Sequence, residues 1–600
     1  MKKMFLAVWL SSVGLSYAAS TASLITWRDW NDAQFEMARV EQKLILLDLE
    51  AVWCHWCHVM DQTTYQDPAV AALLAKHYIS VKVDHDARPD LAERYREYGW
   101  PATIIFDGQG RELVKRAGYI NPADMQALLQ KLIKNPEPEQ AAATTAPKQY
   151  ASTPLLDDNT RRELQQRFVT THDKELGGLD HGQKYLERDT AEYALLLSLR
   201  GDKQAEKIAR KDLTAALALI DPVWGGVYQY STHGDWQHAH YEKLGVNQAE
   251  YIRLYALAYA VLRDPRYLAA AKSINRYSNR FLRSDDGIYY VSQDADLKQG
   301  QKAHDYFKLN DKARRKRGIP RVDKHQYSKE NGLMAEALAT LYSVTGEQEY
   351  LRDAQRAYAW IQQQRRLPSG GFAHDEKDQA GPYLADNLAV LRAALALYTT
   401  TADRQYLLQA RAVADFIETN FRDINKPGYV SAEKIGVLAA VTTIDENIAL
   451  SRALMRMHHY SGEPRYKQMA EYALRYIVTP DIALSRLTEV GILLAEIELS
   501  NDPSHLTIVG HKDQPQALAL FKAALRYPSI FRRIEWWDTR EGAMPNPDVQ
   551  YPALDKPAAY VCTDGRCSLP LFQAEDLLRS AEALTRRVDM AWSLVQRFEA

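Results

Sequence analysis

Two pairs of cysteines are the residues best suited to chemistry in this sequence. The first pair lies in the motif Cys54-His55-Trp56-Cys57-His58, and the second pair is Cys562 and Cys567 near the carboxyl terminus. These are the only 4 cysteines among 600 residues. A chain of this length builds its core without disulfides. Two cysteine pairs that close short loops therefore indicate thiol–disulfide chemistry rather than structural disulfides.

The first pair is placed where a thiolate would be stabilised. The apolar run 44–49 predicts a buried strand, and the segment from Cys54 onward predicts the start of a helix. Unpaired N–H groups and the positive end of the helix dipole favour a thiolate at Cys54. A charged His55 would stabilise it further and make the disulfide oxidising. Asp48, inside the apolar run, is costly to bury unless it has a task such as taking the proton of Cys57.

Other interpretations of these cysteines stay open. Cys-x-x-Cys-His is also the attachment signature of c-type haem, although the strand before the motif disfavours a buried porphyrin there. A metal site made of Cys54, Cys57, His55 and His58 is disfavoured because neighbouring helical positions cannot all converge on one tetrahedral ion. A structural disulfide remains possible for either pair. Cys562 and Cys567 could instead exchange with Cys54 as an internal relay.

The amino-terminal sequence predicts the compartment of the protein, and the net charge excludes one class of partner. Residues 1–18 combine a basic start, an apolar run and small residues, which predicts a cleaved signal peptide and a secreted or periplasmic protein. An uncleaved amino-terminal anchor is the alternative. No later run is apolar enough to predict a membrane span. The net charge of -2, without a long basic run, excludes nucleic acid as an expected partner.

Changes in sequence pattern divide the chain into parts that would position these residues. Short apolar strands alternate with helices in the first part, and long amphipathic helices separated by Gly-Gly turns follow. This repetition predicts a closed toroid of helical hairpins, with an irregular helical domain as the alternative. The predicted parts are a signal peptide (1–18), an α/β domain (19–134), a Pro- and Ala-rich linker (135–156), a helical toroid (157–500) and a carboxyl-terminal α/β segment (501–600).

Several motifs resemble one known family. Asp48, Trp53, Cys54, Cys57 and Pro101 match a thioredoxin domain, in which a cis-proline lies beside the dithiol. The segments that carry the wider resemblance are 53–60, 84–90, 99–101, 230–249, 292–296, 330–339 and 559–570. They resemble the thioredoxin-domain family typified by spermatogenesis-associated protein 20. The resemblance implies a thioredoxin-like domain followed by an all-α (α/α)6 toroid, similar to that of glycosidases and sugar epimerases.

The toroid is expected to gather polar residues in a central cleft. The candidates there are His240, Glu242, Lys243, Trp236, Asp294 and Asp386, which would suit a carbohydrate or peptide ligand. Asp386 could equally be a residue of a helix start. Tyr241, Leu244 and Asn247 depart from the family pattern, which puts the toroid site in more doubt than the redox site.

These observations predict a thiol–disulfide oxidoreductase that acts on protein thiols and needs neither cofactor nor metal. Cys54 would be the nucleophile and Cys57 the resolving cysteine, with Asp48, His55, Trp53 and Pro101 shaping the site. The toroid would bind clients or carbohydrate. The alternatives are a carbohydrate-active toroid with a regulatory thioredoxin domain, and a scaffold without enzymatic activity.

Overall fold

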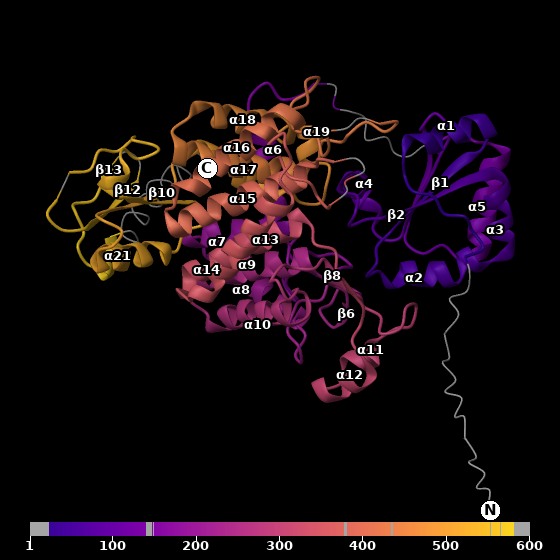
Figure 1. The fold of residues 1–600 in the computed structure, drawn as a ribbon, viewed down its shortest axis with the longest axis horizontal. Helices are drawn as coiled ribbons and strands as arrows, with labels where there is room; N and C mark the ends of the chain where they lie inside the picture. The colour runs from indigo at the N-terminus through magenta and orange to yellow at the C-terminus, as the bar shows by residue number, and fades with distance from the viewer. Residues whose placement is uncertain are drawn as a thin grey trace, which may run out of the picture.

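The computed structural model is elongated and has three parts in a row (Figure 1). It describes residues 23–580 except 140–146, 148, 377, 379, 380, 434, 435, 553, 564 and 565. The predicted signal peptide and much of the predicted linker therefore lie outside the described residues. In Figure 1 an α/β domain lies at one end, a helical toroid fills the middle, and a second α/β domain lies at the other end.

The first domain is a four-stranded sheet of order β2-β1-β3-β4 with helices on both faces. Strands β1 and β2 are parallel, while β3 runs antiparallel to β1 and to β4. The apolar run makes β1 a central strand, which is buried on both faces. The strands are β1 (Leu44–Glu50), β2 (Tyr78–Asp84), β3 (Ala102–Phe106) and β4 (Glu112–Ala117). The helices are α1 (Asp32–Glu41), α2 (His55–Gln62), α3 (Pro68–His77), α4 (Pro89–Arg94) and α5 (Pro122–Lys134).

The middle part is an (α/α)6 toroid. Its inner helices contact one another in a closed ring, and each pairs with an outer helix. The inner helices are buried almost all round, whereas the outer helices have one buried stripe, as expected for these two layers. In ring order the inner helices are α7 (Arg188–Leu199), α9 (Gly245–Leu262), α13 (Ser328–Thr345), α15 (Leu384–Thr401), α17 (Ile444–Ser461) and α20 (Val490–Ser500). Their outer partners are α8 (Lys203–Ala215), α10 (Pro265–Phe281), α14 (Gln348–Gln364), α16 (Arg404–Phe421), α18 (Pro464–Ile477) and α6 (Asp158–Thr170).

Short strands and helices connect the inner and outer helices of the toroid. The strands form a pair, β5 with β6, and a three-stranded sheet of order β7-β8-β9. They are β5 (Tyr230–Thr232), β6 (His238–His240), β7 (Lys243–Leu244), β8 (Ser292–Gln293) and β9 (Val322–Asp323). The short helices are α11 (His304–Phe307), α12 (Asp311–Arg317) and α19 (Pro480–Ala483).

The carboxyl-terminal sheet repeats the strand arrangement of the first domain. Its order is β11-β10-β12-β13, with β10 and β11 parallel and β12 antiparallel to both of its neighbours. The elements are β10 (Ser504–Val509), α21 (Pro515–Leu525), β11 (Arg532–Trp537), β12 (Ala558–Thr563) and β13 (Arg566–Cys567). No cysteine follows β10 where Cys54 follows β1. The second domain thus shares the topology of the first without its dithiol.

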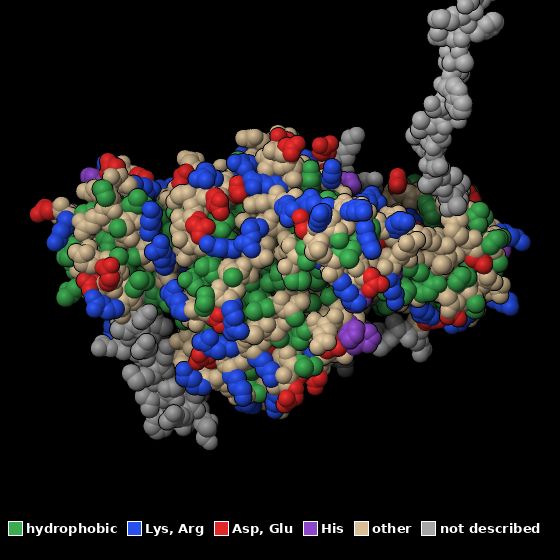
Figure 2. Space-filling model, turned by 90° about the horizontal axis from the view of Figure 1, so that it is seen from below, with side chains coloured by type: hydrophobic (Ala, Val, Ile, Leu, Met, Phe, Trp, Pro, Cys, Tyr) green, Lys and Arg blue, Asp and Glu red, His purple; other side chains and the backbone are tan. Residues whose placement is uncertain are grey.

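The two α/β domains pack on opposite mouths of the toroid. The first lies against the end where inner helices begin, since the Arg96 guanidinium pairs with Asp445 in the first turn of α17. The second lies against the end where they finish, since Lys512 donates to the carbonyl of Ala402, the residue that ends α15. No helix of the described part is long and apolar enough to cross a membrane. Basic and acidic side chains are interspersed on the face seen in Figure 2.

Cys562 and Cys567 form a disulfide between β12 and β13. Figure 1 shows these strands at the opposite end of the molecule from α2, with the toroid between them. The idea of an internal relay with Cys54 is therefore wrong for this arrangement of the chain, because the two disulfides do not face a common interface.

Candidate active site

Cys54 lies at the amino terminus of α2, directly after the turn that follows β1. It is the N-cap residue, and its Sγ accepts the backbone N–H of Cys57 at 3.2 Å. The two cysteines form a disulfide. Both are buried, with 4% of Cys54 and 2% of Cys57 exposed. This position offers a Cys54 thiolate the unpaired N–H groups of the first helical turn.

Aromatic side chains fix the turn that carries the cysteines. The indole N–H of Trp53 donates to a carboxylate oxygen of Asp86 at 2.7 Å. Trp100 packs edge-on against Trp53, with ring centroids 5.2 Å apart, and contacts the small apolar cluster that contains Cys54 and Cys57. The peptide bond between Trp100 and Pro101 is cis. The predicted residues Trp53 and Pro101 thus belong to the surroundings of the dithiol.

Asp48 lies in the middle of β1 and is buried, with one carboxylate oxygen 3.3 Å from Lys82 Nζ. Burial raises the pKa of Asp48, and the charge of Lys82 only partly offsets that rise. Lys82 also binds Glu50 at 2.8 Å and Asp61 at 2.5 Å. These carboxylates raise the pKa of Lys82 although burial lowers it. A raised pKa makes the Asp48 carboxylate a stronger base than an exposed aspartate, which suits it to accept a proton.

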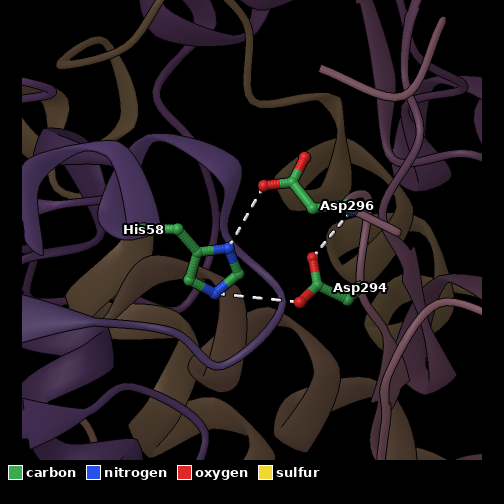
Figure 3. A group of neighbouring side chains, drawn as sticks. All are labelled: His58, Asp294 and Asp296. Carbon is green, nitrogen blue, oxygen red and sulfur yellow. Dashed lines mark hydrogen bonds and ion pairs between the residues drawn. The ribbon is translucent and has the colours of Figure 1, made fainter. Parts of the chain in front are cut away.

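The loop after β8 of the toroid covers the dithiol helix. Nδ1 of His55 lies 2.8 Å from a carboxylate oxygen of Asp296, and Nδ1 of His58 lies 3.3 Å from the other oxygen. On the opposite side of its ring, Nε2 of His58 lies 3.1 Å from the carbonyl oxygen of Val52 and 3.7 Å from Asp294 (Figure 3). Both histidines of the motif are therefore held by carboxylates from another domain.

The pKa values of the carboxylates of Asp294 and Asp296 shift in opposite directions. Burial raises the pKa of Asp294 to about 7, and its Oδ2 has no hydrogen-bond partner among the described residues. The pKa of Asp296 is lowered instead, because hydrogen bonds from His55 and His58 outweigh the effect of burial. Burial lowers the pKa of His58, but its hydrogen bond to Asp296 and the charge of Asp294 together raise it above its usual value.

A second toroid segment reaches the dithiol from residues 242 to 244. Leu244 contacts the apolar cluster of Cys54 and Cys57, whereas Lys243 points away into the toroid and binds Asp221 at 2.8 Å. This alternation is that of an extended chain, so Glu242 faces the same side as Leu244. Burial raises the pKa of Glu242 to about 7, the N–H of His55 opposes the rise, and repulsion from Asp294 adds to it.

The candidate toroid residues therefore do not form one separate cleft. Glu242 and Asp294 lie at the dithiol, and His240 is next to them, with Nδ1 4.0 Å from Glu242. Lys243 is fully buried in its ion pair, and Trp236 is buried with its N–H on the carbonyl of Leu176 at 2.9 Å. The expectation that Lys243 and Trp236 face a ligand cleft is wrong, because both side chains support the toroid itself.

Asp386 belongs to a different cluster at the toroid mouth. Its carboxylate accepts a hydrogen bond from Nδ1 of His374 at 2.9 Å, and Nε2 of His374 lies 2.8 Å from the backbone oxygen of Asp86. Burial raises the pKa of the neighbouring Glu330 to about 7. Such groups are the kind an acid–base reaction on a carbohydrate would use. The thioredoxin-like domain, however, lies against this histidine.

The expected role of His55 also changes. A positive His55 was predicted to stabilise the Cys54 thiolate, but in the structure its Nδ1 is paired with Asp296. A positive charge on this ring would be offset by the carboxylate, and the buried side chains of Glu242 and Asp294 lie near His55 and His58. Buried negative charge disfavours a thiolate. The closed arrangement therefore favours the disulfide form.

The sequence analysis did not identify two residues that contact the site: Lys82, which forms an ion pair with Asp48, and Asp86, which accepts the indole N–H of Trp53. Lys82 could have been found from its place in the strand next to Asp48, because the parallel register puts the two opposite each other. Asp86 gives no such signal, since it lies in a turn 33 residues from Trp53.

The chain is similar to known proteins in its amino-terminal domain and in its toroid. Residues 14–137 match the family model Thioredox_DsbH, described as a protein of unknown function, DUF255. Human spermatogenesis-associated protein 20 is 27% identical over 307 residues, 45% of this chain and 39% of that protein, so the match spans about two fifths of its length. Cellobiose 2-epimerase from Bacillus thermoamylovorans aligns at a TM-score of 0.44 with 11% identity, over 53% of this chain and 86% of that chain.

A shorter relative identifies the family. Thioredoxin-1 of Drosophila melanogaster is 31% identical over 107 residues, which cover 18% of this chain and 95% of that protein. Residues 14–137, which match the family model, contain the four-stranded sheet, the cis-proline and the helix-capping cysteine described above. Through its amino-terminal domain, the chain belongs to the thioredoxin family.

Proposed function

We propose that the protein is a thiol–disulfide oxidoreductase in which Cys54 attacks and Cys57 resolves. The observation that carries this proposal is the position of Cys54 as the N-cap of α2, with its Sγ on the N–H of Cys57. A cysteine there has a lowered pKa and is the partner that attacks.

The exchange needs no group beyond the two cysteines and a client disulfide. The Cys54 thiolate attacks the client disulfide, forms a mixed disulfide and releases one client thiolate. The Cys57 thiolate then attacks Cys54 Sγ, releases the second client thiolate, and leaves the Cys54–Cys57 disulfide. Asp48, buried in β1, accepts the proton of Cys57 as that thiol becomes nucleophilic. The same steps in reverse oxidise a client dithiol.

Burial of both cysteines limits the clients. Leu244 and the carboxylates of the toroid cover the dithiol, so a folded protein client needs the toroid to move away first. The toroid thus acts as a cover that controls access. We further propose that the chain is exported and works in an oxidising compartment, on the basis of the signal-like residues 1–18.

A trapping experiment tests the proposal. The Cys57→Ala variant, expressed with residues 1–18 in place, should accumulate mixed disulfides at Cys54 that reductant releases, because the resolving step is lost. The matched control is the Cys54→Ala/Cys57→Ala double variant, which should trap nothing. Amino-terminal sequencing of the same samples should show cleavage near Ala19. Absence of any adduct together with failure to reduce a disulfide substrate in vitro would refute the oxidoreductase.

A further inference from the structure

His58, Asp294 and Asp296 form a contact between the first domain and the toroid, and their side chains are of the types that bind metal ions. We propose that these three side chains bind one divalent transition-metal ion, which bridges the thioredoxin-like domain and the toroid beside the dithiol. None of the ligands is a thiol, so the site does not depend on the proposed redox function.

The atoms are close enough for one ion. One nitrogen of His58 and one oxygen from each carboxylate lie within 4.8 Å of one another. An ion about 2.0–2.2 Å from each ligand keeps such ligands roughly 3–4 Å apart, so small side-chain rotations close the site. Figure 3 shows the ring of His58 facing both carboxylates, with one ring nitrogen toward Asp296 and the other toward Asp294; the histidine comes from α2 and both aspartates from the toroid.

Hydrogen bonding leaves one nitrogen of His58 available as a ligand, whereas Asp296 also accepts hydrogen bonds from His55 and from the backbone N–H of Gly300. Nε2 of His58 lies 3.1 Å from the carbonyl oxygen of Val52, which can only accept, so Nε2 carries a hydrogen. In the neutral ring Nδ1 then has its lone pair facing Asp296 at 3.3 Å. The positive charge between these two atoms comes either from a proton on Nδ1, which makes the ring cationic, or from a metal ion bound to the neutral ring. The orientation of the ring by a backbone carbonyl is usual for a ligating histidine.

Unsatisfied buried oxygens are the second indication. Asp294 is 1% exposed and Glu242 is 3% exposed. Neither Asp294 Oδ2 nor Glu242 Oε2 has a hydrogen-bond partner among the described residues. Buried carboxylate oxygens without partners are costly, and coordination of a cation satisfies them. Glu242 is close enough for the charge of Asp294 to raise its pKa.

The neighbouring acidic group serves as an internal comparison. Asp48, Glu50 and Asp61 also lie within 4.8 Å of one another, but the ammonium of Lys82 already binds all three. Among the described residues, no lysine or arginine forms an ion pair with Asp294 or Asp296, whose partners are His55 and His58, so no ammonium or guanidinium occupies that group. The charge of His58, and to a smaller extent that of Arg321, opposes the rise that burial causes in the pKa of Asp294.

An ion can reach the site. A cavity of about 530 Å³ opens beside His58 and is lined by Val52, Asp61, Gln299 and Arg321. Imidazole and carboxylate ligands without a thiolate suit ions such as Mn²⁺ and Zn²⁺. This site differs from one built on Cys54, Cys57, His55 and His58, because its ligands come from two domains and need not converge from one helix.

The test uses the full chain with Cys54→Ser and Cys57→Ser, so that no thiolate of that pair can bind metal. After chelation and dialysis, Mn²⁺ is titrated and followed by calorimetry and by its electron paramagnetic resonance signal. One ion should bind per chain. Asp294→Asn in this background should weaken binding by at least about tenfold, whereas Asp61→Asn should leave it unchanged.

Thermal unfolding gives a second readout. Mn²⁺ should raise the melting temperature of the parent and not that of the Asp294→Asn or Asp296→Asn variant, because an ion bound to the native state stabilises it. If the parent binds no ion, or Asp294→Asn binds as the parent does, the proposal is wrong. A protonated His58 ring would then supply the positive charge between the carboxylates. These outcomes are independent of trapping at Cys54.

Discussion

His55 of the dithiol helix and Asp296 of the toroid are in contact, with Nδ1 2.8 Å from the carboxylate, although 241 residues separate them in sequence. The contact couples the chemistry of the cysteines to the position of the toroid. While the contact holds, the Asp296 carboxylate lies beside the ring of His55, the residue next to Cys54 in the sequence. If the toroid moves away, that charge leaves with it, and the Cys54 thiolate becomes more stable.

Removal of this carboxylate should make the disulfide more oxidising. We expect Asp296→Asn to raise the reduction potential of the Cys54–Cys57 pair by about 30 mV, roughly tenfold in the exchange equilibrium. The potential is measured by equilibration with glutathione buffers in the presence of a chelator. Asp305→Asn, in the same toroid region and 92% exposed at the side chain, is the control and should leave the potential unchanged. An unchanged or lower potential for Asp296→Asn would show that His55 is not compensated by this contact.

The ammonium of Lys82 should be essential for the stability of the first domain. Lys82→Met leaves Asp48, Glu50 and Asp61 without their shared cation. Loss of one partner of a buried ion pair costs about 3–5 kcal/mol, and the partial exposure of Asp61 and Glu50 reduces this to roughly 2–3 kcal/mol. The loss should be larger at pH 8 than at pH 5, because burial raises the pKa of Glu50 to about 7 even with Lys82 present.

Urea unfolding at the two pH values measures this loss. Lys76→Met, an exposed lysine of α3, is the matched control and should change the free energy of unfolding little at either pH. Equal losses at pH 5 and pH 8 for Lys82→Met would contradict the electrostatic explanation.

The dithiol was predictable from sequence because its signals are local. A buried strand, a helix-capping Cys54 and Pro101 before the next strand lie within one domain and follow general rules of chain geometry. The contact between His55 and Asp296 was not predictable, because it depends on how two domains pack. The neighbours Glu242 and Lys243 show the same limit on a smaller scale. Both were predicted to face a ligand cleft. Because successive side chains of an extended chain point to opposite sides, Glu242 faces the dithiol and Lys243 binds Asp221.

Deprotonation of His374 at the mouth of the toroid should lower the stability of the fold at alkaline pH. Burial lowers the pKa of His374, but Asp386 outweighs this and raises it to about 9, above the usual value of 6.5. A raised folded-state pKa means that protonation stabilises the fold. The contribution is complete below pH 6.5 and is lost as the pH rises toward 9, by up to about 1.4 kcal/mol per pH unit.

The His374→Gln variant tests this pH dependence. Its melting temperature should fall less than that of the parent between pH 6.5 and 9, since the titrating group is gone. His77→Gln, in α3 on the outer side of the first domain (Figure 1), should follow the parent curve. Parallel curves for His374→Gln and the parent would exclude His374 as the source of the alkaline loss.

The disulfide between Cys562 and Cys567 should stabilise its own domain without affecting Cys54. It closes a loop with a sequence separation of 5 between β12 and β13, at the far mouth of the toroid. Loop-closure entropy for so short a loop is worth about 2 kcal/mol. The Cys562→Ala/Cys567→Ala variant should therefore lose about that much free energy of unfolding of the carboxyl-terminal domain, while the glutathione-measured potential of Cys54–Cys57 stays that of the parent. A shifted potential would mean that the two ends of the molecule exchange electrons after all, through an arrangement of the chain other than this one or through a second copy.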